Sequence, residues 1–166
     1  SDIGVANDFR RIGLIRNPTN FGTSTVASAD TRRQLYAAIF SSVSGTFTAD
    51  EEINQASTGA VGKVVEYDST NKILYYYQTR FPDVGTDSNG NQTAFSGANA
   101  ITGQSSSASA TPDTSNSTTT NGAVFVSGYS NPELAFDSGD IIYVEERSPI
   151  TRASDQTENI KLIIEF

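Results

Sequence analysis

Short stretches in which apolar and polar residues alternate recur along the chain, and they predict β-strands. The clearest stretch is 72–80, in which successive side chains fall on opposite faces and tyrosine occurs on both. Residues 33–40 fit either a helix face or a strand, and the turn-like and strand-like sequence that follows favours the strand. Further strands are predicted at 9–15, 47–53, 59–67, 123–127, 140–146 and 160–166. We therefore expect an all-β fold.

The predicted strands group into a β-sandwich-like sheet system with an inserted small β-barrel-like module. Residues 1–40 and 122–166 are predicted to form the discontinuous sandwich-like core, because their strands are too short to bury apolar surface separately. Residues 41–121 form the predicted insert. Residues 103–122 carry no large apolar side chain, which predicts a mobile, low-complexity loop.

A weak internal repeat lies inside the predicted insert. Four residues recur 48 positions later with the same identity. They are Phe47, Ile53, Ser57 and Ala60, repeated as Phe95, Ile101, Ser105 and Ala108. This spacing suggests two similar hairpin arms that close a small barrel with phenylalanine and isoleucine inside. With two copies and four identities, chance is the alternative.

Composition limits the classes of function. The chain has 166 residues, no histidine and no cysteine, so Ser-His-Asp and Cys-His mechanisms within it are excluded, as are disulfides and zinc-thiolate sites. Its net charge of -8 makes nucleic acid an unfavourable partner. No apolar stretch is long enough to span a membrane. The absence of methionine and the start at Ser1 suggest a processed product or a piece of a longer protein.

Paired carboxylates are the remaining route to catalysis. Glu51-Glu52 and Glu145-Glu146 are adjacent in predicted strands, so the members of each pair point to opposite faces. Asp155 and Glu158 could meet across a turn, or could instead pair with neighbouring arginines. Residues 87–91 superficially resemble a calcium loop, but their spacing favours a tight turn. We expect no enzyme activity, no cofactor and no metal.

Two surface features suggest binding. Tyr75, Tyr76 and Tyr77 could form a platform that stacks on a carbohydrate, although packing in a core or interface is favoured. Five of the eleven basic residues lie in the first 33 positions, on an otherwise acidic chain. Arg10 and Arg11 are candidate partner contacts in this basic segment, and a solvated strand edge is the alternative.

Two blocks of the sequence resemble a known family. The first is the ten residues Phe9 to Pro18, and the second runs from Ser138 to Arg147 and continues through Pro149-Ile150, residues 155–158, Ile160 and Phe166. Together they are similar to the baseplate wedge subunit "gene product eight" of T-even-like contractile-tailed bacteriophages. The middle, from Ser41 to about Gly128, departs from the coliphage form and looks like an insert of cyanophage relatives.

The resemblance implies a non-enzymatic structural protein of the virion tail baseplate, assembled in the host cytoplasm. It implies other baseplate wedge proteins as partners and a homodimer of the full-length protein, with no nucleic acid and no membrane. The alternative is a tail-surface adhesin or glycan-binding β module.

The polar connection 147–158 contains the family-motif residues that are the strongest candidates for partner contact. These are Arg147, Asp155, Gln156, Thr157 and Glu158. They could form a docking surface for a neighbouring wedge protein, or a self-contained hydrogen-bonded loop that orients the last strand. In that last strand, Ile160, Leu162, Ile164 and Phe166 share one face, which we expect to be packed rather than free.

Overall fold

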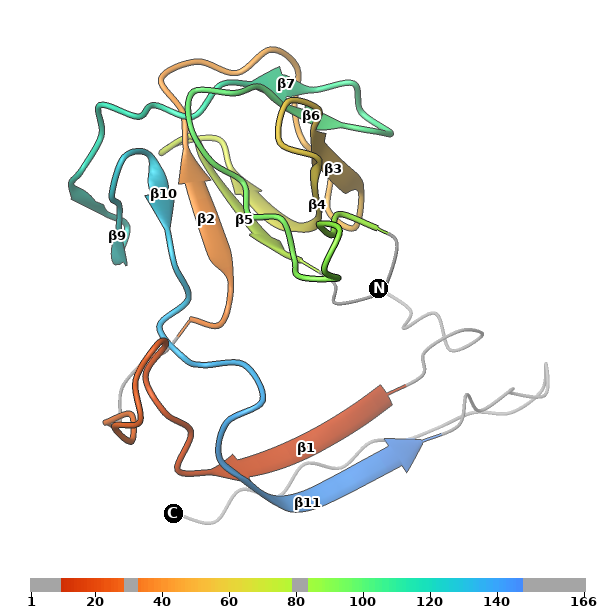
Figure 1. Cartoon of the computed structure of the whole chain (residues 1–166), viewed down its shortest axis with the longest axis vertical. Coiled ribbons are helices and arrows are strands. Elements are labelled where there is room, and N and C mark those ends of the chain that lie inside the picture. The colour runs from red at the N-terminus through yellow and green to blue at the C-terminus, as the bar shows by residue number, and fades with distance from the viewer. Residues whose placement is uncertain (1–9, 29–32, 79–83, 148–166) are drawn as a thin grey trace, which may run out of the picture. The chain divides into compact units, whose positions relative to one another are not determined.

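The computed structural model describes residues 10–28, 33–78 and 84–147, and within them every regular element is a strand (Figure 1). All the strand pairs are antiparallel. The strands are β1 (Arg10–Arg16), β2 (Tyr36–Ile39), β3 (Glu52–Gln55), β4 (Ala60–Asp68), β5 (Ile73–Tyr77), β6 (Ile101–Gly103), β7 (Ser109–Ala110), β8 (Thr119–Thr120), β9 (Ala123–Val124), β10 (Tyr129–Ser130) and β11 (Asp140–Arg147). The predicted all-β class is confirmed, and a sandwich-like arrangement fits these sheets. The described part contains no helix that could span a membrane.

The chain divides into two compact units. One consists of residues 19–138 and contains a seven-stranded sheet in the order β10-β2-β5-β4-β3-β6-β7, together with the small β8-β9 sheet. The other consists of residues 1–18 and 139–166, and its described part contains the β1-β11 pair. The expectation that the segments 9–16 and 140–146 belong together is confirmed for the described residues 10–16 and 140–146.

Two strands lie elsewhere than the sequence predicted. We grouped residues 36–39 and 123–127 with the terminal segments, but β2 lies between β10 and β5 in the seven-stranded sheet. Strand β9 pairs with β8 across the two-residue Asn121-Gly122 turn, where both residues have positive φ. That turn closes a local hairpin, so β9 pairs within the 19–138 unit. The predicted strand 160–166 lies outside the described residues.

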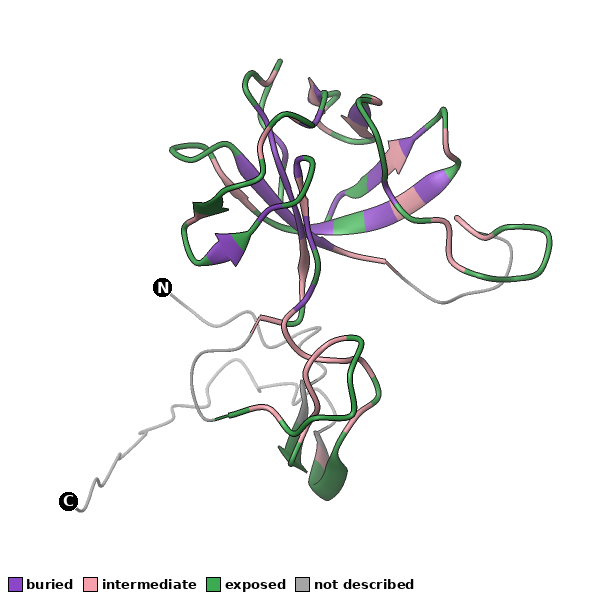
Figure 2. Ribbon diagram, turned by 60° about the vertical axis from the view of Figure 1, so that its left-hand side comes forward, coloured by how far each residue is buried: buried purple, intermediate pink, exposed green. Residues whose placement is uncertain are grey.

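The sheet is buried on both faces because β5 sends bulky side chains to each side. Leu74 and Tyr76 belong to one core cluster, whereas Ile73 and Tyr75 belong to a second cluster on the opposite face. The four side chains are almost entirely removed from solvent, and the buried stretch of the sheet is visible in Figure 2. The prediction from the sequence that tyrosine occurs on both faces of this strand is confirmed by Tyr76 in one cluster and Tyr75 in the other.

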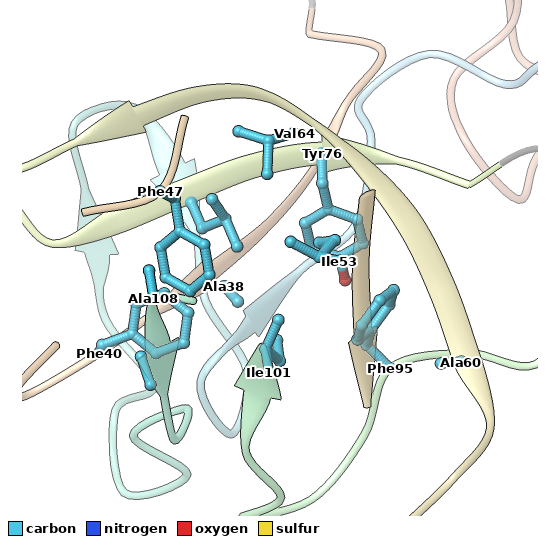
Figure 3. Packing of buried hydrophobic residues seen from close by; sticks show 12 residues of the cluster. Ala38, Phe40, Phe47, Ile53, Ala60, Val64, Tyr76, Phe95, Ile101 and Ala108 are labelled. Carbon is cyan, nitrogen blue, oxygen red and sulfur yellow. The ribbon is translucent and has the colours of Figure 1, made fainter. Parts of the chain in front are cut away.

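The internal repeat has a physical basis in the larger core cluster. Its phenylalanine, isoleucine and alanine positions are all buried there, in both copies (Figure 3). Asn54 pairs with Thr102 in the β3-β6 ladder, and these two residues are themselves 48 positions apart. A local twofold axis through this pair therefore relates the β3-β4 hairpin to the β6-β7 hairpin.

Closure of these arms into a barrel stays a prediction. Isolated bridges join Phe40 to Pro112 and Ser44 to Ser109, so β7 and the residues after it contact the chain leaving β2. These are single bridges rather than a continuous ladder.

Residues 103–122, predicted to be a mobile loop, instead contain β7, β8 and a tight turn after β6. Ala108 and Ala110 are buried in the larger cluster. Small residues can pack closely between strands without giving the alternating pattern of large side chains on which strand prediction depends. The prediction of an element-free connection is therefore wrong.

We expect Ile53→Ala and Ile101→Ala to destabilise the protein by similar amounts, about 2–5 kcal/mol each, because both side chains are fully buried at equivalent positions. Val124→Ala is the matched control, since Val124 is 63% exposed. Urea unfolding would measure all three. A large cost at Ile53 with none at Ile101 would contradict the equivalence of the two hairpins.

Candidate functional site

The three consecutive tyrosines do not form an open aromatic platform. Tyr75 and Tyr76 are only 8% and 2% exposed, and Tyr77 is partly buried. The Tyr76 ring packs between Tyr36, at a centroid distance of 5.7 Å, and Phe95, at 4.8 Å. Burial, with smaller contributions from Tyr129 and Tyr36, raises the pKa of Tyr76 well above its usual value. Tyr75 and Tyr76 therefore pack in the core, which is the interpretation that the sequence favoured.

One basic residue of the N-terminal segment serves an internal role. The Arg33 guanidinium donates to the Ser130 hydroxyl at 2.8 Å, to the Asn131 carbonyl at 3.0 Å and to the Leu35 carbonyl. Its backbone N–H donates to the Glu133 carboxylate at 2.7 Å. Burial lowers the pKa of Arg33, and the charges of Glu133 and Tyr75 oppose that shift. Arg33 therefore fastens the chain before β2 to the chain after β10.

Glu51 is a buried carboxylate held by hydrogen bonds from three residues. It is 4% exposed, whereas its neighbour Glu52 is exposed, as the opposite-face prediction required. One oxygen accepts from the Thr48 N–H at 2.7 Å and the Ser106 hydroxyl at 2.7 Å. The other accepts from the N–H groups of Ser105 and Ser106, at 3.1 and 2.9 Å. This carboxylate therefore joins the start of β3 to the turn between β6 and β7.

The pKa of Glu51 reflects two opposing effects. Burial alone would raise it, but the bonds from Ser106, Thr48 and Ser105 outweigh burial, so the pKa lies below its usual value. Glu51 is thus ionised at neutral pH and its oxygens are occupied. An ionised carboxylate with both oxygens bonded is poorly suited to act as a general acid or base.

Space for this carboxylate depends on Gly103. A Cβ atom at position 103 would lie 2.6 Å from the Glu51 Oε2 atom and 2.6 Å from the Ser106 hydroxyl oxygen. Any larger residue would displace the bonded group. Sequence reasoning missed this site, because nothing in the spacing of Glu51 and Ser106 links them.

A second buried polar side chain, Gln55, also ties β3 to distant segments. Its amide nitrogen donates to the Asn99 carbonyl at 2.9 Å and to the Tyr129 hydroxyl oxygen at 3.2 Å. Its amide oxygen accepts from the Thr58 hydroxyl and the Ser96 N–H. Both ends of this fully buried amide are therefore satisfied, and it is structural.

Other features of the described residues bear on metal binding and on surface hollows. They contain no group of three or more acidic, histidine or cysteine side chains placed to hold a metal. Asp87 accepts from the N–H groups of Asn89 and Asn91, which confirms the tight turn predicted at 87–91. A surface hollow of about 430 Å³ is lined mostly by serine and threonine, with Asp113 its one charged residue.

Most of the exposed large apolar side chains among the described residues lie on the β1-β11 ribbon, whose described side chains are mainly exposed (Figure 2). The register pairs Arg10 with Arg147 and Arg11 with Glu146, so three predicted contact residues meet at one end. A salt bridge of 3.2 Å joins Arg16 to Asp140 at the other end. The ribbon's exposed apolar residues are Leu14, Ile15, Ile141, Ile142, Tyr143 and Val144. Asp155, Gln156, Thr157 and Glu158, the other predicted contacts, lie outside the described residues.

Comparison with known proteins identifies the family. The family model described as "Bacteriophage T4, Gp8" matches residues 72–166, which is more than half of the chain. The chain belongs to the phage Gp8 family. No curated protein and no solved structure matches it.

The Gp8 match confirms the resemblance to the baseplate wedge subunit and identifies a baseplate structural protein of the virion tail. It includes β11 and the second sequence block, whereas Phe9 to Pro18 lies before the matched range. It also includes residues 72–121 of the predicted insert. The origin of that insert in cyanophage relatives stays a prediction.

In this Gp8 chain we expect Glu51→Gln to cost about 1–3 kcal/mol at neutral pH, because the amide replaces one acceptor oxygen with an NH2 donor that faces the N–H and O–H donors of the site. The folded-state pKa of Glu51 is lowered, so its ionised form stabilises the fold above the unfolded-state pKa. That contribution is lost as pH falls through the folded-state pKa. The difference between wild type and variant should therefore shrink in acid.

Urea unfolding at a series of pH values would measure this difference. Glu52→Gln is the matched control, since Glu52 is the exposed neighbour on the opposite face. Equal and pH-independent effects of the two substitutions would show that Glu51 has no special role.

Proposed function

We propose that this Gp8-family chain is a building block of the baseplate wedge, acting in tail assembly through protein-protein contacts and not as an enzyme. The observation that carries the proposal is the family match over residues 72–166. In support, the chain has no histidine or cysteine, and its one described buried carboxylate is occupied by structural hydrogen bonds. Other wedge proteins are the proposed partners.

The ribbon formed by β1 and β11 is the proposed contact surface. Leu14 and Tyr143 are partners in its register and so share a face. They are 56% and 48% exposed. Apolar area of this kind is costly to leave in water, and burying it against a neighbouring protein would supply binding free energy.

Two finer features belong to the same proposal. The full-length protein forms a homodimer, and it assembles with its partners in the host cytoplasm before joining the tail. Both follow from the family resemblance, and sedimentation of the full-length protein would test the dimer.

We expect the double substitution Leu14→Lys and Tyr143→Lys to reduce co-assembly with neighbouring wedge proteins by tenfold or more. Loss of about 1.5–3 kcal/mol of apolar burial per side chain exceeds the 1.4 kcal/mol that corresponds to a factor of ten. Sedimentation of mixtures of purified wedge proteins would measure the loss.

Val126→Lys is the control, since Val126 is 68% exposed but lies in the 19–138 unit. The melting temperature of each variant, measured alone, separates loss of binding from loss of folding. Undiminished assembly of a folded double variant would rule out this face as the contact surface.

A further inference from the structure

Two asparagine–glycine pairs lie in turns of the 19–138 unit. They are Asn89-Gly90 and Asn121-Gly122, and in the sequence no other asparagine is followed by glycine. All four residues are exposed. Glycine has no Cβ atom, so its backbone nitrogen is open to the side chain of the residue before it. The asparagine side chain and this nitrogen are therefore two groups of one chain that can react with each other.

We propose that Asn89 is a site of spontaneous deamidation and that the fold protects Asn121 from the same reaction. The Gly90 nitrogen attacks the Asn89 Cγ atom, and ammonia leaves with the Nδ2 atom and the proton of the Gly90 N–H. Water then opens the cyclic imide that has formed. Cleavage at Cγ gives aspartate, and cleavage at the main-chain carbonyl carbon gives isoaspartate. Both steps are intramolecular substitution or hydrolysis, so no enzyme and no oxidant takes part.

The backbone of Asn121 is unsuited to this attack. Asn121 and Gly122 form the two-residue turn of the β8-β9 hairpin, with φ values of 49° and 77°. Positive φ at both residues identifies a type I′ turn, in which ψ of the first residue is about +30°. For an L-residue this ψ directs the following nitrogen away from Cβ. The Gly122 nitrogen can reach the Asn121 side chain only after both φ and ψ of Asn121 change, which breaks the turn.

Packing also holds the Asn121 turn in place. The Asn121 amide nitrogen donates to the Tyr75 hydroxyl oxygen at 3.3 Å. Tyr75 belongs to the smaller core cluster, and Ala123, the residue that follows the turn, is buried in the same cluster. A turn that is fixed by a side-chain bond and by a buried neighbour opens less often than a free surface turn.

Asn89 is held less firmly. It is the third residue of the turn 87–90, in which the Gly90 N–H donates to the Asp87 carbonyl at 3.0 Å. Aspartate at the first position and glycine at the fourth are typical of a type I turn. The φ of Asn89 is not positive, so attack requires rotation of ψ and loss of the Gly90 bond, without a change in the sign of φ.

Deamidation changes the charge and the path of this turn. Either product places a second carboxylate close to that of Asp87, which accepts from the backbone N–H groups of Asn89 and Asn91. Isoaspartate also adds a carbon atom to the main chain between positions 89 and 90. The Gly90 and Asn91 N–H groups then lose their present alignment with Asp87. The surface of the 19–138 unit therefore changes with time after synthesis.

Peptide mapping by tandem mass spectrometry follows both sites in one sample of the full chain, incubated in mildly alkaline buffer. In the folded chain we expect conversion at Asn89 to be about tenfold faster or more than at Asn121, because the hairpin must open before Asn121 can react. In guanidinium chloride, where both turns are lost, the two sites should convert at similar rates.

Three results would overturn the proposal. They are equal rates at the two sites in the folded chain, a faster rate at Asn121, and no conversion at Asn89 during an interval that converts the unfolded chain. The first two would show that the hairpin does not protect Asn121, and the third would show that the 87–90 turn is protected as well.

Ion-exchange chromatography gives a second readout, because conversion adds one negative charge to the folded chain. Asn89→Gln should suppress the acidic form, since the longer side chain closes its ring far more slowly. Asn91→Gln is the matched control from the same turn and should acidify as wild type does. An undiminished acidic form in Asn89→Gln would contradict the proposal. Both measurements use the isolated chain, so their result is independent of whether the proposed function is correct.

Discussion

The packing of the 19–138 unit depends on one constraint: its seven-stranded sheet must be covered on both faces by few apolar side chains. Leucine, isoleucine, valine and phenylalanine make up only 37 of the 166 residues. The chain meets the constraint with the paired tyrosines of β5, with alanines at close contacts, and with buried polar groups that tie distant loops together. Glu51, Gln55 and Arg33 each make several hydrogen bonds across long sequence separations. In a thin core such bonds position segments that apolar packing alone would leave loose.

Alternating large side chains allowed much of the sheet to be predicted. The strands at 59–67 and 72–80 were predicted from their alternating side chains. The segments 9–16 and 140–146 were grouped because each is too short to form a core alone, and β1 pairs with β11 in the structure. The arms of the internal repeat were found differently, from four identities that recur 48 positions later. The two strands could be predicted because a strand depends on neighbouring residues and on a hydrophobic period of two.

The remainder depends on contacts that leave no local pattern. The turn after β6 is built from serine, whose hydroxyl and N–H groups bond a carboxylate 55 positions away. Neither the serines nor Glu51 has an unusual sequence context. A glycine is required at position 103 because the Glu51 carboxylate and the Ser106 hydroxyl fill the space that a Cβ atom would occupy. The positions of β2 and β9 were missed because Ala37, Ala38 and Ala123 are small and give no pattern of large side chains that would indicate which sheet these strands join. The register of β1 and β11 places the candidate contact residues Arg10, Arg11 and Arg147 at one end of the ribbon. The candidate platform residues Tyr75 and Tyr76 are instead buried.

The ends of the 19–138 unit meet at one point. The Thr19 N–H donates to the Ser138 hydroxyl at 3.0 Å, and the Ala135 N–H donates to the Thr19 carbonyl at 2.9 Å. A unit whose entry and exit strands touch can be cut out and its neighbours rejoined with little loss of chain reach. Evolution can therefore lengthen, shrink or replace everything between these two residues without changing the register of the ribbon. In this chain, the 19–138 unit and the segments that carry β1 and β11 can therefore be altered separately.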